Sequence, residues 1–156
     1  MRKVEKSVAV WYSAQEMYEL VIDAESYPQF LPWCNSAEIL ERHPDGLLAV
    51  LGLSIGGIQQ KFTTRTKHVS GESVAIDLVE GPFSALHCLW RFAPLSGMPV
   101  SVDVPKACKI HFEASYEFSS KILAMAVGLI FDRMMDTFVD AFIKRAEVVY
   151  GKPKFF

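Results

Sequence analysis

Side chains that could carry acid–base or metal chemistry are scattered along this chain. The four histidines are expected in turns or on the outward sides of strands, and they are His43, His68, His87 and His111. Asp77 and Glu80 lie near an expected turn, and neither has an evident partner for general acid–base catalysis. The sequence contains no nucleophile elbow, phosphate-binding loop or metal-ligand cluster. We therefore predict no catalytic residue, no metal and no enzymatic activity.

Neutral polar side chains alternate with bulky ones in IQQKFTTRTKH, residues 58–68. A strand here places Gln60, Phe62 and Thr64 on one face, because successive side chains of a strand point to opposite faces. Amide and hydroxyl groups form hydrogen bonds but are poor acids or bases. The opposite face carries a row of cations, the basic ridge: Lys61, Arg65 and Lys67, with Arg91 and Lys109 as further candidates from other strands. A row of this kind is most often a solvated face.

The segment YPQFLPWC, residues 27–34, concentrates aromatic side chains where two prolines forbid a regular element. Tyr27, Phe30 and Trp33 are too large to leave in solvent without a reason. The segment either caps the core or forms the wall of a binding site. Cys34 at its end has no neighbouring base, so we expect an unreactive thiol.

Hydrophobic periodicity indicates one strand, a short helix, about six further strands joined largely by turns, and a long closing helix. Ser13 followed by Glu16 predicts a capping box at the start of the short helix, whose apolar stripe contains Met17. Alternating residues predict strands over 3–11, 36–42, 47–55, 58–68, 74–80, 83–92 and 106–119.

From Ser119 to Gly151 the period becomes helical, and about thirty residues would form one helix ~45 Å long. The expected inner stripe is Leu123, Val127, Ile130, Met134, Phe138, Ala141 and Arg145. Apolar residues go nearly all the way around the run 122–131, so either a loop covers its outer side or that side is an apolar portal to a cavity. Gly128 within this run predicts a close approach or a kink.

Length and composition favour a single globular domain over residues 1–151 with a short tail over 152–156. The 156 residues are 51% hydrophobic and 22% charged, and the net charge of −2 gives no overall bias toward nucleic acid or acidic membranes. The longest uncharged run is too short to span a bilayer, which needs ~20 apolar residues. Three distant cysteines, no CxxC motif and no signal peptide lead us to expect a reduced, cytoplasmic protein.

Several segments together resemble one family. VEKSV, YPQFLPWC, FTTR, LVEGPF, LWRF, FDRM and VDAFIKRAEVVYG occur in the order and approximate spacing of the coenzyme Q-binding, or RatA (ribosome-association toxin), type of START-like protein. This group is also described as polyketide cyclase/dehydrase-like, or SRPBCC. The resemblance covers nearly the whole chain, except the first few residues, the final KPKFF and a longer loop over 95–105. It implies an α+β helix-grip fold, in which a curved antiparallel sheet wraps around a long C-terminal helix and encloses a hydrophobic cavity.

The resemblance implies two alternative functions. In the first, the cavity binds ubiquinone or a similar lipid, and the protein acts as a carrier that supports respiration. Gln60 and Thr64 would then hydrogen-bond the quinone head group. Transient membrane contact is compatible with this role, no other cofactor is expected, and the oligomeric state stays open. The expected ligand-binding residues are Tyr27, Phe30, Leu31, Trp33, Gln60, Phe62, Thr64, Phe83, Trp90, Phe92, Met134 and Phe138.

In the second function, the protein binds the large ribosomal subunit and blocks subunit association. The basic ridge of Lys61, Arg65 and Lys67 would contact ribosomal RNA, because phosphate contacts need clustered cations and not a positive net charge. No aromatic residues interleave the ridge for stacking on bases. The sequence alone leaves the choice between these two functions open.

Overall fold

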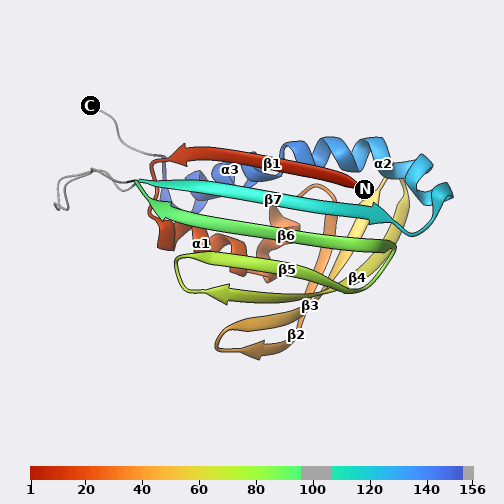
Figure 1. Cartoon of the computed structure of the whole chain (residues 1–156), viewed down its shortest axis with the longest axis horizontal. Helices are drawn as coiled ribbons and strands as arrows, with labels where there is room; N and C mark the ends of the chain where they lie inside the picture. The colour runs from red at the N-terminus through yellow and green to blue at the C-terminus, as the bar shows by residue number, and fades with distance from the viewer. Residues whose placement is uncertain (96–106, 153–156) are drawn as a thin grey trace.

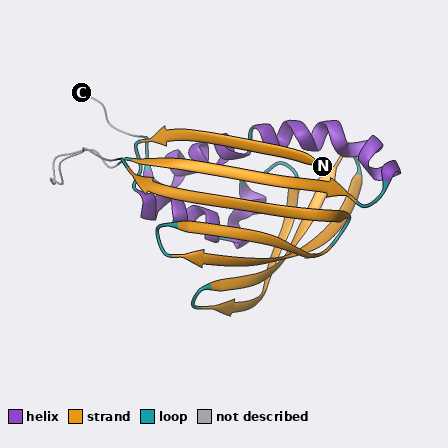
Figure 2. Ribbon diagram, in the orientation of Figure 1, coloured by secondary structure: helices purple, strands orange, loops and turns teal. Residues whose placement is uncertain are grey.

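The computed structural model describes residues 1–95 and 107–152, and these form one antiparallel sheet covered by helices on its concave side (Figures 1 and 2). The strand order is β1-β7-β6-β5-β4-β3-β2. The strands are β1 Arg2–Val10, β2 Cys34–His43, β3 Gly46–Ile55, β4 Ile58–Val69, β5 Ser73–Glu80, β6 Phe83–Pro94 and β7 Cys108–Phe118. The helices are α1 Ala14–Ile22, the 3-10 helix η1 Ala24–Gln29, α2 Lys121–Asp136 and α3 Phe138–Tyr150.

Strand β7 shows why the sheet has one buried face. Ile110, Phe112 and Ala114 are buried, whereas Lys109 and Glu113 are exposed. This is the alternation expected of an antiparallel sheet with one face on the core. The strand lies between β6 and the edge strand β1, so segments far apart in the sequence pair with each other at this side of the sheet.

Local capping chemistry places α1 where the sequence predicts it. The Ser13 hydroxyl accepts a hydrogen bond from the Glu16 amide at 3.0 Å, and the Ser13 amide donates to the Glu16 carboxylate at 2.9 Å. The helix buries Met17, Leu20 and Val21 against the sheet. The chain then continues into η1, which contains Pro28.

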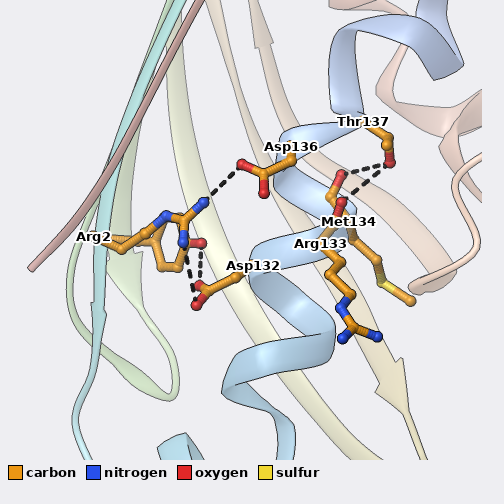
Figure 3. Close-up of polar contacts among 7 residues, drawn as sticks. Arg2, Asp132, Arg133, Met134, Asp136 and Thr137 are labelled. Carbon is orange, nitrogen blue, oxygen red and sulfur yellow. Dashed lines mark hydrogen bonds and ion pairs between the residues drawn. The ribbon is translucent and has the colours of Figure 1, made fainter.

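The prediction of one long C-terminal helix is wrong, because Thr137 interrupts it. This residue has φ −108° and ψ 10°, and it separates α2 from α3. Its hydroxyl donates to the carbonyls of Arg133 and Met134, both at 3.3 Å (Figure 3). A threonine that bonds back to the preceding turn bends or ends a helix.

The inner stripe of these helices also lies one position further along the chain than expected at four places. The residues expected inside are Ile130, Met134, Ala141 and Arg145, whereas those buried are Phe131, Met135, Phe142 and Ala146, and Ile130 is 42% exposed. Phe131 faces inward because its ring packs edge-on against Tyr116, with 4.8 Å between centroids. The predicted burial of Phe138 is confirmed. A close approach and a kink were the two alternatives at Gly128, and the first is wrong, because a Cβ at this position would meet no atom within 4 Å.

Aromatic rings fill the space between the sheet and α3. Trp90 and Phe112 of the sheet meet Phe138 and Phe142 of α3, with centroid separations of 5.0 to 5.8 Å. Packing of this kind stabilises the grip of the sheet on the helix. Apart from Leu95 and Lys152, the loop over 95–105 and the tail over 152–156 lie outside the described residues.

Candidate functional site: a pocket beneath an aromatic lid

A hollow of about 520 Å³ lies between the YPQFLPWC segment and the two C-terminal helices. We call it the lid pocket, and the segment over residues 27–33 the lid. The walls are mainly apolar on the lid side and mixed on the helix side. The lining residues are Gln29, Phe30, Leu31, Pro32, Trp33, Met134, Thr137, Phe138, Asp140, Ala141, Lys144, Arg145 and Val148.

The lid is held by aromatic contacts with α3. Phe30 lies edge-on to Phe142 with centroids 5.0 Å apart, and Trp33 stacks on Phe138 at 6.3 Å with an interplanar angle of 28°. The Tyr27 hydroxyl donates to the carbonyl of Val21. Burial raises the pKa of this hydroxyl, so it stays protonated and keeps its donor role. The lid therefore rests on the core and still leaves a hollow at its edge.

Charged groups of α3 form the rim of the pocket. The Arg145 guanidinium donates to the Gln29 side chain at 3.0 Å and lies 5.3 Å from the centroid of Phe30. This pair of contacts fastens the lid to α3 through a hydrogen bond and a cation–π interaction. Lys144 is exposed beside it. Asp140 accepts a hydrogen bond from Lys6 of β1 at 2.8 Å, so its charge is already compensated.

Two buried indole groups have no hydrogen-bond acceptor among the described residues. They are the Nε1–H groups of Trp33, in the lid, and Trp90, in the sheet. Both rings lie against Phe138, with centroids 6.3 and 5.8 Å away. A buried donor without a partner costs about 1–3 kcal/mol, so each is a place where a bound acceptor would stabilise the protein.

The structure brings some of the predicted ligand-binding residues together and separates others. Phe30, Leu31, Trp33, Met134 and Phe138 line the lid pocket. A second set is buried in the core and does not line it: Tyr27, Phe62, Phe83, Trp90 and Phe92. The cavity expected between the sheet and the C-terminal helix is filled by packed aromatic rings, and the hollow lies instead between the helices and the lid.

The predicted head-group residues lie outside the lid pocket. Thr64 is buried and borders a small space of about 20 Å³ beneath α1 and η1. Gln60 was expected on the inner face, but its side chain is exposed. The reason is that β5 ends at Glu80, opposite Thr63, so the first residues of β4 lack a neighbouring strand on that side.

The polar rim was not identified from the sequence, which gave no role to Gln29, Thr137, Asp140 or Lys144. Arg145 had been placed on the buried stripe of the helix. A guanidinium on such a stripe is itself a signal, because a charged group there must reach solvent or a polar partner. Here it reaches both Gln29 and the face of Phe30.

The titratable groups give little support for catalysis. Burial raises the pKa of Cys34 to about 11, of Cys88 to about 12 and of Cys108 to about 11, so these thiols are protonated near neutral pH. Asp77, expected without a partner, is paired with His87 at 2.6 Å on the outer face of the sheet. A hydrogen bond from His111 lowers the pKa of Glu113 on that same face.

The basic ridge lies on the outer face, away from the lid pocket. Lys61, Arg65 and Lys67 of β4 are all exposed, as expected. The strand register sets Arg65 directly opposite Asp77, which weakens the positive potential at that point. Arg91 and Lys109 are also exposed.

The chain is similar in sequence to one protein family and to named proteins of other organisms. A family model described as polyketide cyclase / dehydrase and lipid transport matches residues 10–143. A protein of Escherichia coli strain K12 named ribosome association toxin RatA is 40% identical over 151 residues, covering 97% of this chain and 90% of that protein. A Xenopus laevis protein named coenzyme Q-binding protein COQ10 homolog B, mitochondrial, is 28% identical over 149 residues, covering 94% of this chain and 59% of that protein.

A solved structure confirms the expected fold. A START superfamily protein from Mycobacterium smegmatis superposes with a TM-score of 0.73 at 22% identity, over 94% of this chain and 98% of that one. At this level of identity the likeness establishes the α+β helix-grip architecture and leaves the ligand open.

Proposed function

The chain belongs to the polyketide cyclase / dehydrase and lipid transport family, and we propose that it binds an apolar, oxygen-bearing ligand in the lid pocket. The observation that carries the proposal is the combination of an apolar hollow of about 520 Å³ with two unpaired indole donors around Phe138. Ligand pockets are typically apolar cavities of ~300–1,000 Å³ with a few placed polar groups. A carrier role, rather than a catalytic one, follows from the chemistry of the lining.

The lining favours an isoprenoid quinone or a lipid of similar chemistry. Met134 and Val148 offer apolar contacts for a chain, and the indole of Trp33 offers a donor for a carbonyl or methoxy oxygen. A quinone supplies acceptors only, which suits a site whose unpaired buried groups are donors. The similarity to a coenzyme Q-binding protein supports the same class of ligand.

Phe138 is the group that would have to move for a ligand to reach both indoles. It is the first residue of α3, next to the break at Thr137, and its ring packs against both Trp33 and Trp90. A small shift of α3 about Thr137 would join the lid pocket to the space beside Trp90. In this proposal the contact of Arg145 with Gln29 and Phe30 closes the lid over the ligand.

The lining supports binding without catalysis. The acidic group on the described rim, Asp140, is held by Lys6, and Arg145 is held by Gln29 and the face of Phe30. Cys34, the thiol nearest the lid in sequence, is kept protonated by the raised pKa of about 11.

The test is a titration of the purified protein with a short-chain ubiquinone, followed by Trp fluorescence and thermal stability. Trp33→Phe removes one donor and should weaken binding about tenfold, the equivalent of one net hydrogen bond of ~1.4 kcal/mol. Trp11→Phe is the matched control, because Trp11 is exposed at the end of β1 and should leave the affinity unchanged. Unchanged fluorescence and melting of the wild type would overturn the proposal, as would an unaltered affinity in Trp33→Phe.

Ribosome association is the second candidate, and the 40% identity to proteins named for it is the observation that favours it. We propose the basic ridge as the contact, on the large subunit. Co-sedimentation with separated large subunits should then weaken as salt rises, because released counterions drive phosphate binding. Lys61→Glu/Lys67→Glu should abolish the complex, whereas Lys121→Glu/Arg133→Glu, an equal charge change on α2, should preserve it. If Lys61→Glu/Lys67→Glu still co-sediments with the large subunit, the basic ridge is not the ribosome contact.

A further inference from the structure

The outer side of α2 carries a line of exposed apolar side chains. Ile122 is 82% exposed, Met125 86% and Leu129 77%. Their spacing of three and four residues places them on one line along the helix. The sequence left open whether a loop covers this side of α2, and no loop among the described residues does so. Contiguous exposed apolar surface of this kind marks an interaction site.

Asp132 and Asp136 lie seven residues after Met125 and Leu129, on the same line of α2, and ion pairs with β1 compensate their charges. Asp132, Asp136 and Asp140 turn toward β1, where Arg2 lies 3.6 Å from Asp132 and 2.7 Å from Asp136, and Lys6 lies 2.8 Å from Asp140. Figure 3 shows Arg133 extending from α2 on the side opposite Arg2. The acids are thus neutralised internally. The cations Lys121, Arg133 and Lys144 are exposed.

The apolar line continues into the lid pocket. Ile130, 42% exposed, follows Leu129 around the helix, and Met134, one turn further on, lines the pocket. We call the exposed part of this surface the docking face, and it consists of Ile122, Met125, Leu129, Ile130, Lys121 and Arg133. No helix among residues 1–95 and 107–152 is long and apolar enough to cross a membrane.

We propose that the docking face rests on the surface of an anionic lipid bilayer, with the lid pocket opening toward the acyl region. Exposed apolar side chains flanked by cations suit a membrane interface, where the side chains insert and the cations meet anionic head groups. The role of this contact in loading the pocket rests on the proposed ligand binding, whereas the contact between the docking face and the bilayer is independent of it.

A second copy of the chain is a poorer occupant of this face. In a two-fold pair the same patch meets itself, so Lys121 and Arg133 of one copy would face the same cations of the other. The nearby acids cannot compensate, because Arg2 and Lys6 already hold them. An anionic surface satisfies both the apolar line and the cations.

The test is co-sedimentation with phosphatidylcholine vesicles, with and without phosphatidylglycerol. We expect binding that is strongest with the anionic lipid and that weakens with salt. Met125→Asp/Leu129→Asp should reduce vesicle binding about tenfold or more, because two inserted side chains are lost and two anions gained. Val69→Asp/Val79→Asp is the matched control, since these valines are 53% and 51% exposed on β4 and β5. Lys121→Glu/Arg133→Glu should remove the preference for anionic lipid, and Lys61→Glu/Lys67→Glu should keep it.

The outcomes separate this inference from the proposed function. Met125→Asp/Leu129→Asp should still bind quinone in the absence of vesicles, and Trp33→Phe should still bind vesicles. Absence of vesicle binding in the wild type overturns the docking proposal whatever the quinone titration gives. An equal loss of vesicle binding in Met125→Asp/Leu129→Asp and in Val69→Asp/Val79→Asp also overturns it. A concentration-dependent dimer abolished only by Met125→Asp/Leu129→Asp would overturn it in favour of a second copy. Loss of ribosome co-sedimentation in that variant, without vesicle binding by the wild type, would overturn it in favour of the ribosome.

Discussion

Replacing Phe138 tests the packing on which both the fold and the site depend. Its ring meets Trp33, Trp90, Phe112 and Phe142, with centroids 5.1 to 6.3 Å away. Ile130 is the matched control, because an unbroken inner stripe would place it inside together with Phe138, whereas the structure leaves it 42% exposed.

The expected magnitudes differ strongly between the two positions. Truncation of a buried phenylalanine to alanine costs about 3–5 kcal/mol in lost burial and residual cavity. Phe138→Asp adds an unpaired buried carboxylate, so its total cost approaches the ~5–15 kcal/mol by which a domain of this kind is stable. Ile130→Asp, by contrast, should change the free energy of unfolding by no more than about 1 kcal/mol, since the side chain already contacts solvent.

Urea denaturation followed by Trp fluorescence measures these differences, because Trp33 and Trp90 both contact Phe138. With a slope of roughly 2 kcal/mol per molar urea, a loss of ~4 kcal/mol moves the midpoint of Phe138→Ala down by about 2 M. Phe138→Asp should fail to give a folded baseline. Equal damage from Ile130→Asp and Phe138→Asp would refute the orientation of α2. A stable Phe138→Asp variant would refute the packing of α3.

Three further predictions concern other parts of the chain. Gly128→Ala should raise the free energy of unfolding by about 1 kcal/mol in the same urea assay, because the added Cβ meets no atom within 4 Å and alanine favours the helix; a loss would indicate an undetected contact. Ser13→Ala should lower the free energy of unfolding by about 1 kcal/mol through loss of the helix cap. Ser13→Asp keeps a hydrogen-bond acceptor and should retain most of the stability of the wild type. Burial raises the pKa of the Cys88 thiol from 9.0 to about 12, so its contribution to stability is complete below pH 9 and is lost as the pH rises toward 12. Cys88→Ala should therefore show a shallower alkaline fall in midpoint, and an identical pH profile would contradict this assignment.

The predictions that succeeded from sequence rest on short-range chemistry. The capping box of Ser13 and Glu16 and the alternation along β7 each depend on residues a few positions apart. The break at Thr137 was missed because the side chain of a threonine within a helix either points outward or forms a hydrogen bond to the preceding turn, and the local sequence does not distinguish these. In the structure Thr137 bonds to the preceding turn, and the helices on its two sides each contact the sheet, through Phe131 and Phe142, at residues distant in sequence.

Only half of the candidate site could be predicted from the sequence, for the same reason. The composition of residues 27–33 identified the lid, but the partners of the lid on α3 come from more than a hundred positions away, as the hydrogen bond between Arg145 and Gln29 shows. The position of Gln60 depended on where β5 ends, which no residue near Gln60 specifies. Non-local pairing of this kind decides which face of an element is covered.

The pairing of β1 with β7 has a consequence for the order in which the molecule forms during synthesis. Arg2 is 134 positions ahead of Asp136, Lys6 is 134 positions ahead of Asp140, and every residue of β1 pairs with β7. At ~5–20 residues per second, the ribosome therefore releases β1 roughly 7–27 s before those helix partners exist. The meander from β2 to β6 can assemble in that interval, whereas β1 waits as an unpaired strand. Strand β1 is thus translated long before its partners and is among the last strands to become native, so a chaperone bound to its edge would delay closure of the whole grip.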